Sequence, residues 1–487
     1  ADGRPNTSKE DTSTKDATTT ASTIELGPCP VIEPPGPVEN DLPEDALCGV
    51  YEVPENRATG EGRMLEIDVI VLPATGPKAK PDPIFPIAGG PGSAVTESAP
   101  WWADAPEREK RDIVFVDQRG TNGSHLLDCP PLADDPQVYL EPYFEIEAMT
   151  RCRDELMAKA DLTQYGTDAF VDDLNDVRAA LGYDQINLMG GSYGSRASLV
   201  YMRRHPETVR TANLSGLAPP AFRNPLYHAQ EAQNALEAVL AQCRADRECL
   251  RAYGDLTGVW EDVLDELEAS PAEVEIVDRE TQETHTVTLA RGPAASGLRV
   301  FMYSTEGSRR VPKILHAAKQ GDLSPLASAA MGSSRALDRA LAEGQLLSVV
   351  CAEDLARIDP AEIDPLTENT FLGAQRVRDQ MAACAIWPER VAPSTMGDAV
   401  DVEVPTLLLS GAIDPVTGPW WGEEAASHLP NSLHIIAPIA HYSIGDLDCL
   451  DQIDAAFLDA GSVDGLDVSC VAEMDYPPFE LPGDDES

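Results

Sequence analysis

The sequence is poor in positive charge: 36 Lys and Arg stand against 83 Asp and Glu, which gives a formal net charge of −47. A surface this anionic repels nucleic acids and acidic membranes, so we exclude both as partners. Long apolar runs are missing as well, and none approaches the roughly 18 residues that span a bilayer. The acids are spread over the whole chain, which is typical of proteins from high salt or of acidic secreted proteins in general.

Metal-ligand spacing and phosphate-binding motifs are also missing. The ten cysteines include no Cys-x-x-Cys pair and have no His at ligand spacing, which argues against a zinc site. The chain's Gly-rich loop is not followed by the Gly-Lys-Ser pattern that cradles phosphate. The sequence therefore predicts neither a metal nor an organic cofactor.

The cysteines are even in number and fall into successive couples, which favours disulfides and an oxidising compartment over free thiols in a cytosolic enzyme. From proximity alone the couples are Cys29 with Cys48, Cys129 with Cys152, Cys243 with Cys249, Cys351 with Cys384, and Cys449 with Cys470. The chain begins at Ala1 without a Met, so we expect that an export signal has been removed. The expected location is secreted, periplasmic or at the cell surface.

At 487 residues the chain is long enough for one large core and a second unit. Residues 1–27 are polar and predict a disordered leader. Strands and helices alternate over 28–220, which indicates an α/β core with a mainly parallel sheet. Residues 221–400 read mostly as amphipathic helices and predict a lid, and the sheet resumes in 401–487, which ends in an acidic tail.

A helix is expected from Thr167 to Leu181, in this first part of the core. Its apolar residues lie on one stripe. Its four aspartates, expected to face solvent, are Asp168, Asp172, Asp173 and Asp176.

The run Gly190-Gly191-Ser192-Tyr193-Gly194 has the G-x-S-x-G pattern of a nucleophile elbow. A strand-like segment, 185–189, precedes it, and apolar residues at helical spacing follow it. Small residues two positions before and after Ser192 permit the sharp turn that exposes its Oγ. Glycine-flanked serines also occur in ordinary turns, but the strand and helix on either side favour a catalytic serine.

Candidates for the base and its orienting acid follow in chain order. Asp414 lies three residues past a buried strand that ends at Gly411, and His441 lies just past the last strand, 433–437. Nucleophile, acid and His in this order, with both partners at carboxyl ends of strands, is the α/β-hydrolase arrangement. The alternatives are a structural histidine and one of the many solvated acids.

A Gly-rich loop, 89–92, follows another expected strand and could bring backbone N–H groups close to a ligand. We expect the oxyanion hole to use the N–H of Tyr193, the residue after the nucleophile, and the N–H of Gly90. A simple tight turn is the alternative for this loop.

Together these motifs resemble the prolyl iminopeptidase and tripeptidyl aminopeptidase family of α/β-hydrolases. The segments that carry the resemblance are Ala88-Gly89-Gly90-Pro91-Gly92, Asp117-Gln118-Arg119-Gly120, the elbow, Asp414-Pro415-Val416-Thr417, His441, and in the lid Leu298-Arg299-Val300-Phe301-Met302-Tyr303 and Cys351-Ala352-Glu353-Asp354. The resemblance implies an α/β-hydrolase fold with a large helical lid inserted before the penultimate strand.

The resemblance also implies a secreted serine exopeptidase that cleaves from a free N-terminus. Acidic lid residues hold the substrate ammonium in such enzymes, and Glu353, with Asp354 behind it, is the candidate here. Many prolyl iminopeptidases have His where this chain has Ala88, which leaves room for the tripeptidyl or esterase-like branch.

Three functions follow from these patterns. The first is an aminopeptidase that forms an acyl-enzyme on Ser192, with a peptide as its substrate. The second is a carboxylesterase that uses the same triad on small or aryl esters. The third, a non-catalytic binding protein on a hydrolase fold, predicts a missing triad member, whereas Ser192, Asp414 and His441 are all present.

Overall fold

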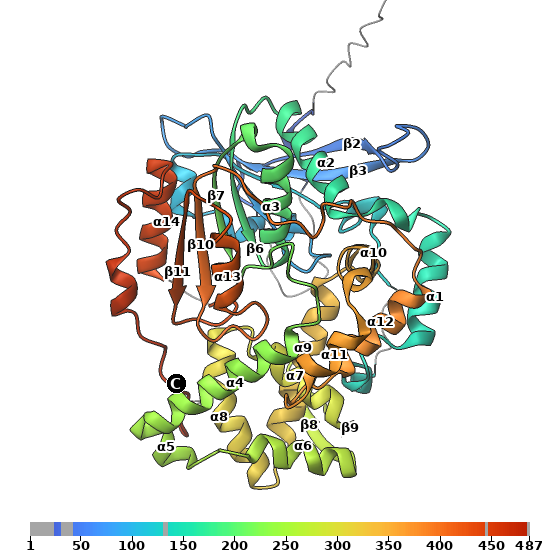
Figure 1. The fold of residues 1–487 in the computed structure, drawn as a ribbon, viewed down its shortest axis with the longest axis vertical. Coiled ribbons are helices and arrows are strands. Elements are labelled where there is room, and N and C mark those ends of the chain that lie inside the picture. The colour runs from blue at the N-terminus through green and yellow to red at the C-terminus, as the bar shows by residue number, and fades with distance from the viewer. Residues whose placement is uncertain (1–23, 31–41, 130–134, 444–446, 485–487) are drawn as a thin grey trace, which may run out of the picture.

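The computed structural model describes residues 24–30, 42–129, 135–443 and 447–484 (Figure 1). Most of the predicted leader, 1–23, lies outside the described residues. The described chain forms a twisted sheet with helices on both faces, and a mainly helical part lies beyond one end of the strands (Figure 1).

The central sheet has nine strands in the order β1-β2-β3-β5-β4-β6-β7-β10-β11. The first three strands form an antiparallel edge, and all pairings from β5 to β11 are parallel. Their bounds are β1 Gly27–Pro28, β2 Leu47–Pro54, β3 Met64–Leu72, β4 Ile84–Ile87, β5 Ile113–Val116, β6 Ile186–Gly191, β7 Val209–Ser215, β10 Thr406–Gly411 and β11 Ser432–Ala437. The predicted α/β class with a mainly parallel sheet is confirmed.

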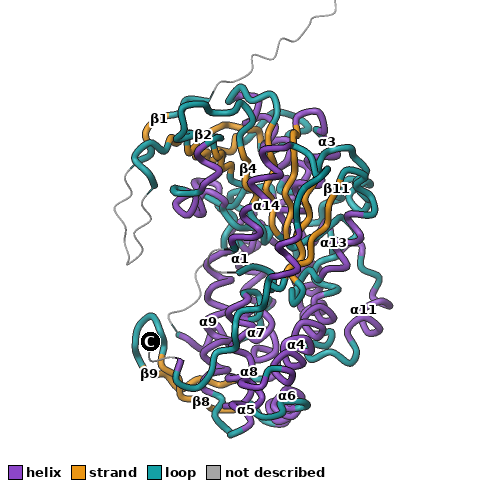
Figure 2. The backbone as a smooth tube through the Cα atoms, turned by 90° about the vertical axis from the view of Figure 1, so that its left-hand side faces the viewer, coloured by secondary structure: helices purple, strands orange, loops and turns teal. Residues whose placement is uncertain are grey.

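Alternate residues of the buried strands face helices on opposite sides of the sheet. In β10, Leu407 packs with Ile453 and Phe457 of α14 (Asp448–Ala460). The next residue, Leu408, belongs to the core on the other side, to which α3 (Tyr193–Arg204) and α13 (Pro419–Ala426) contribute. Figure 2 shows the sheet between α14 and the pair α3 and α13. Continuous apolar strands therefore follow from burial on both faces.

Between β7 and β10 the chain forms nine α-helices, a short 3-10 helix (Leu355–Arg357) and a two-stranded hairpin of β8 (Ala272–Val277) and β9 (Thr284–Leu289). The helices are α4 His228–Ala245, α5 Arg247–Tyr253, α6 Val259–Ala269, α7 Arg291–Phe301, α8 Thr305–Lys319, α9 Ser324–Ala340, α10 Glu343–Glu353, α11 Pro360–Thr367 and α12 Gln375–Ile386. Helices α4 to α9 form most of a second hydrophobic core, whereas α10 and α12 pack into the core of the sheet. The domain boundaries at 220 and 400 stay a prediction.

Helix α2 (Thr167–Ala180) forms where the sequence predicts it, but one expected solvent-facing acid is buried. Asp173 is fully buried and accepts hydrogen bonds from Nε and Nη2 of Arg119 at 2.7 and 2.8 Å. Nη1 of Arg57 donates to Oδ1 at 2.5 Å, the same oxygen that accepts from Nη2 of Arg119. The expectation was wrong at this residue because two arginines from distant segments neutralise a carboxylate on the inner face of the helix.

All five predicted cysteine couples are disulfides. Cys351–Cys384 ties α10 to α12, and Cys129–Cys152 ties the segment after β5 to α1 (Ile146–Met157). Within the described ranges, no helix combines the length and the apolar character that crossing a bilayer requires.

Candidate active site

Ser192 occupies the turn between β6 and α3, with φ 56° and ψ −125°. This left-handed conformation is rare for a residue with a side chain, and it exposes Oγ at the carboxyl end of the strand. The turn leaves no room for side chains at its flanks: a Cβ on Gly194 would lie 2.2 Å from the carbonyl oxygen of Ile87, and one on Gly190 would lie 2.4 Å from that of Gly194. The glycines of the motif are therefore required by close backbone approach.

The predicted acid and base are hydrogen-bonded to each other. Nδ1 of His441 lies 2.7 Å from Oδ2 of Asp414, which is 3% exposed. Thr417 donates its hydroxyl to the same oxygen at 2.8 Å, and the N–H groups of Val416 and Thr417 donate to Oδ1. Burial alone would raise the pKa of Asp414, but His441 and the hydrogen bonds from Thr417 lower it below its usual range. Asp414 therefore stays ionised and holds His441 with Nε2 free for proton transfer.

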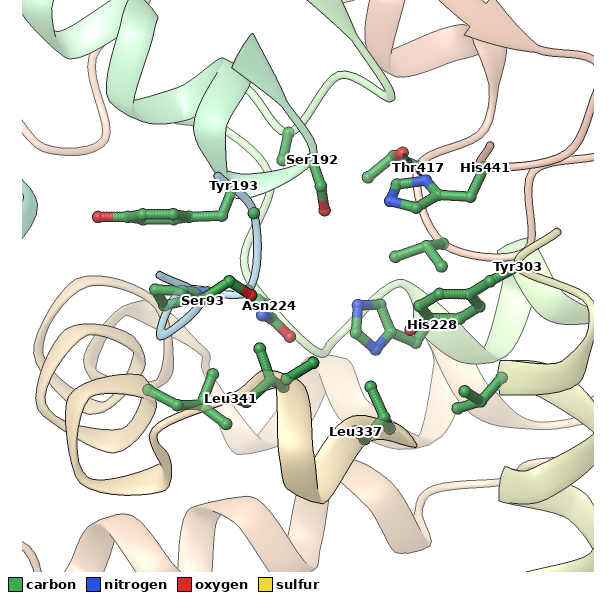
Figure 3. Close-up of a pocket in the computed structure, with 18 of the residues that line it drawn as sticks. Ser93, Ser192, Tyr193, Asn224, His228, Tyr303, Leu337, Leu341, Thr417 and His441 are labelled. Atoms are coloured by element: carbon green, nitrogen blue, oxygen red, sulfur yellow. Dashed lines mark hydrogen bonds between the residues drawn. The ribbon is translucent and has the colours of Figure 1, made fainter. Parts of the chain in front are cut away.

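Ser192 and His441 line one cavity of about 430 Å³, which is large enough for a small ligand. They arrive from different elements, Ser192 from the elbow and His441 from the loop after β11. Figure 3 shows the Ser192 side chain directed into this cavity, with the His441 ring beside it. The structure thus brings the three predicted residues together, with Asp414 behind His441.

The two predicted oxyanion donors lie at the same cavity. Tyr193 is the first residue of α3, so its N–H has no partner within the helix, and both Tyr193 and Gly90 line the cavity. Gly90 has φ 105°, a conformation that few residues other than glycine adopt. The phenol of Tyr193 points away into the core, where Thr167 lies 2.7 Å from its hydroxyl. The arrangement can place two N–H groups next to an oxygen that becomes negative near Ser192.

Two family profiles match the chain: one described as alpha/beta hydrolase fold matches residues 82–243, and one described as TAP-like protein matches residues 369–470. The chain has the α/β-hydrolase fold. With Ser192 and His441 at one cavity and the buried Asp414 bonded to the histidine, this α/β-hydrolase is a serine hydrolase.

The curated relatives of this α/β-hydrolase include peptidases. Serine protease Hip1 of Mycobacterium tuberculosis is 27% identical over 490 residues, which cover 92% of this chain and 91% of the relative. Tripeptidyl aminopeptidase of Streptomyces lividans is 26% identical over 204 residues, 37% of each chain. Among solved structures, proline iminopeptidase of Mycobacterium smegmatis is 16% identical, covers 85% of this chain and 98% of its own, and has a TM-score of 0.42. The resemblance to an α/β-hydrolase peptidase family is confirmed.

The structure places the two predicted ammonium anchors of this α/β-hydrolase in internal ion pairs. Glu353 is fully buried, does not line the cavity, and accepts hydrogen bonds from the N–H and hydroxyl of Thr167 at 2.8 and 2.6 Å and from Arg390 at 3.2 Å. Asp354 does line the cavity, but Nη1 of Arg196 contacts both of its oxygens at 2.7 and 2.8 Å. The anchoring role stays a prediction, and these placements argue against it, because neither carboxylate is free to take an ammonium.

Several residues at the site of this α/β-hydrolase were assigned no role from the sequence. Thr417, which bonds Asp414, ends a segment that carries the family resemblance, and Arg299 and Tyr303 lie in another. Their i, i+4 spacing was the available signal, with Arg299 in the last turn of α7 and Tyr303 two residues beyond its end. Arg376 also lines the cavity, and no sequence pattern marks it.

Proposed function

We propose that this serine hydrolase is an exported aminopeptidase that releases N-terminal residues, proline or short peptides, through an acyl-enzyme on Ser192. The observation that carries the proposal is the placement of Ser192 and His441 on one cavity, with Asp414 2.7 Å behind the imidazole. The peptidase names of the relatives, Hip1 and tripeptidyl aminopeptidase, support peptide substrates. The five disulfides support export, because disulfides persist in oxidising compartments.

In the proposed reaction, Nε2 of His441 takes the proton of Ser192 Oγ as the oxygen attacks the scissile carbonyl. The N–H groups of Tyr193 and Gly90 stabilise the negative oxygen of the tetrahedral intermediate. His441 then donates the proton to the leaving amine, the C–N bond breaks, and an ester on Ser192 remains. Water attacks this ester with His441 again as the base, which releases the acid and restores the hydroxyl. Asp414 stabilises the imidazolium formed in each half.

A carboxylesterase is the second candidate, and one observation favours it. Asp354 is the one carboxylate among the described residues that line the cavity, and it is already paired with Arg196. An aminopeptidase needs a group that holds the substrate ammonium, whereas an ester substrate needs no such group and its leaving group needs less protonation. Both candidates use the same triad.

A matched substrate panel separates the two candidates. Prolyl, alanyl and tripeptidyl arylamides with free amines are compared with their N-acetylated forms and with p-nitrophenyl esters, for wild type and Ser192→Ala. Ser427→Ala, at an exposed serine after α13, is the control substitution. Cleavage confined to free-amine arylamides and lost only in Ser192→Ala establishes the aminopeptidase. Turnover of esters alone establishes the carboxylesterase, and activity that survives in Ser192→Ala contradicts both.

A further inference from the structure

The cavity beside Ser192 is rich in positive charge, although the protein as a whole carries −47. Arg196, Arg299 and Arg376 line it together with a single carboxylate, Asp354. Asp354 forms an ion pair with Arg196, because Nη1 of that arginine lies within 2.8 Å of both carboxylate oxygens. Arg299 and Arg376 therefore line the cavity without an acidic partner in its described lining.

Arg376, in the first turn of α12, makes no hydrogen bond or ion pair within the described ranges, and its Nε is buried without a partner. Its guanidinium packs instead over the rings of Phe144 and Tyr143, 5.1 and 5.7 Å from their centroids. Asp379, one turn along the same helix, accepts a hydrogen bond from Gln375. Burial and then the neighbouring Arg299 lower the pKa of Arg376 to about 10, against the opposing effect of Tyr303, Tyr143 and Asp379, so Arg376 remains charged at neutral pH.

Arg299 is 2% exposed, and its partners are neutral. It donates to the hydroxyl of Tyr303 at 2.7 Å, and Nδ1 of His228 lies 3.4 Å from the same nitrogen. Burial and then the charges of Arg299 and Arg376 place the pKa of His228 well below its ordinary value, so its ring is neutral at pH 7. Neither Tyr303 nor His228 therefore supplies a negative charge that would offset the two guanidinium groups.

The arginine pair lies close to the reacting groups. Tyr303, whose hydroxyl accepts from Arg299, packs its ring edge-on against that of His441 with 5.4 Å between centroids. Figure 3 shows Tyr303 and His228 below the His441 ring, in the wall of the same cavity as Ser192. Arg299 and Arg376 also line a neighbouring cavity of about 310 Å³, whose described lining includes the carboxylates of Glu141, Glu268 and Asp379. A substrate group bound to them would be a short distance from the scissile bond.

A buried guanidinium without an anion is costly, and a carboxylate ligand removes that cost through charge-assisted hydrogen bonds. We propose that Arg376 and Arg299 form a subsite for a carboxylate of the substrate, so that the enzyme selects peptides or esters with an anionic group near the scissile bond. This inference rests on the proposed function of Ser192. The carboxylate is either the side chain of an acidic residue or the terminal carboxylate of a short peptide, and both have the same chemistry.

Two pairs of substrates distinguish these sources. Glutamyl and glutaminyl arylamides differ only in a side-chain carboxylate, and tripeptides with a free or an amidated C-terminus differ only in the terminal one. For an esterase, p-nitrophenyl hemiglutarate and its methyl ester form the equivalent pair. We expect kcat/KM to favour the carboxylate form by at least about tenfold in one pair, because a hydrogen bond to a charged group is worth that factor or more.

The preference should depend on Arg376. Arg376→Gln is expected to lose it, Arg376→Lys to keep part of it, and Arg378→Gln to keep all of it. Arg378 is the matched control, because it lies on the same helix, is 59% exposed in its side chain and pairs with Asp364 away from the cavity. Equal kcat/KM within every pair for wild type, or a preference unchanged in Arg376→Gln, overturns the proposal.

Binding to Ser192→Ala separates this inference from the proposed function and does not require a foldable Arg376 variant. Calorimetry of Ser192→Ala should detect glutarate and not glutaramide. Glutarate binding without hydrolysis of any amide or ester by wild type contradicts the proposed function and supports the subsite. Ser192-dependent hydrolysis of neutral substrates with no glutarate binding contradicts the subsite and supports the function.

Discussion

Thr417 donates its hydroxyl hydrogen to Oδ2 of Asp414 over 2.8 Å, and this is the same oxygen that lies 2.7 Å from Nδ1 of His441. Thr417 Oγ1 is itself 3.2 Å from Nδ1. The acid of the proposed triad is thus fixed by a side chain three residues further along the same loop. The orientation of His441 depends on Thr417 as well as on Asp414, which makes Thr417 a positioning residue.

Removing this hydroxyl should lower turnover without changing substrate binding. Thr417→Val is expected to reduce kcat about tenfold at constant KM, since one hydrogen bond to a charged group is lost. Thr417→Ser keeps the hydroxyl and should retain most of the activity. Asp414→Asn should cost far more, on the order of 10⁴ in kcat, because it removes the group that fixes the histidine tautomer. A Thr417→Val enzyme with raised KM and normal kcat would place Thr417 in substrate binding instead.

Gly194, two residues after the nucleophile, should tolerate no side chain. In Gly194→Ala the new Cβ would meet the backbone oxygen of Ile87 at 2.2 Å, so the elbow must shift. We expect activity to fall about 10²-fold or more, as for a misplaced catalytic group, together with a lower Tm. Gly191→Ala is the control within the motif, because its Cβ would meet only the rotatable hydroxyl of Ser215, at 3.3 Å. Similar losses in both variants would contradict the steric explanation.

The buried pair of Asp173 and Arg119 should contribute strongly to stability. Asp173→Asn leaves a buried guanidinium without its anion and is expected to lower the free energy of unfolding by roughly 3–5 kcal/mol. Asp176 lies on the same helix with a side chain that is 41% exposed. Asp176→Asn should lower the free energy of unfolding by no more than about 1 kcal/mol. Urea unfolding of the two variants and wild type measures the difference. Equal costs would mean that burial does not set the strength of these ion pairs.

One partly buried acid, Asp454, predicts a dependence of stability on pH. Burial raises the pKa of Asp454, in α14, to about 7. A hydrogen bond from Asn213 lowers this pKa, whereas the charges of Asp451 and Glu107 raise it further. The folded state therefore binds this proton more tightly than the unfolded state, whose pKa is about 4. The contribution of Asp454 to stability is greatest below pH 4 and falls by on the order of 3 kcal/mol as the pH rises to 7.

Asp454→Asn should remove this dependence, because the amide oxygen can still accept from Asn213 and carries no proton to lose. We expect the variant to exceed wild type in unfolding free energy by an amount that grows between pH 5 and pH 8. Parallel curves of stability against pH for the two proteins would contradict the buried titration.

The elbow, the acid and the histidine could be predicted from the sequence because each is marked by its immediate neighbours. The glycines around Ser192 indicate a tight turn. A strand ends just before Asp414 and another just before His441, so both residues lie at the carboxyl-terminal edge of the parallel sheet. The disulfide couples followed for a related reason, since each joins cysteines that are close in the chain.

The surroundings of the charged residues could not be predicted in this way. Asp173 has the helical position of a solvent-facing acid, but Arg119, in the loop that follows β5, donates hydrogen bonds to it. Glu353 has the sequence context of a lid anchor, but Thr167, 186 residues away, donates hydrogen bonds to both of its carboxylate oxygens.

The sequence by itself determined the strand-turn-helix at Ser192, the order of the proposed triad and the α/β class, because backbone conformation and the period of burial are encoded by residues near in the chain. Only the tertiary structure decided which charges are paired and which are left facing the cavity. Arg299 and Arg376 come from two different helices, α7 and α12. Asp354 is paired with Arg196, which lies on a third helix, α3. A guanidinium and its anion interact over a few ångströms, a distance that long-range packing sets and chain order does not.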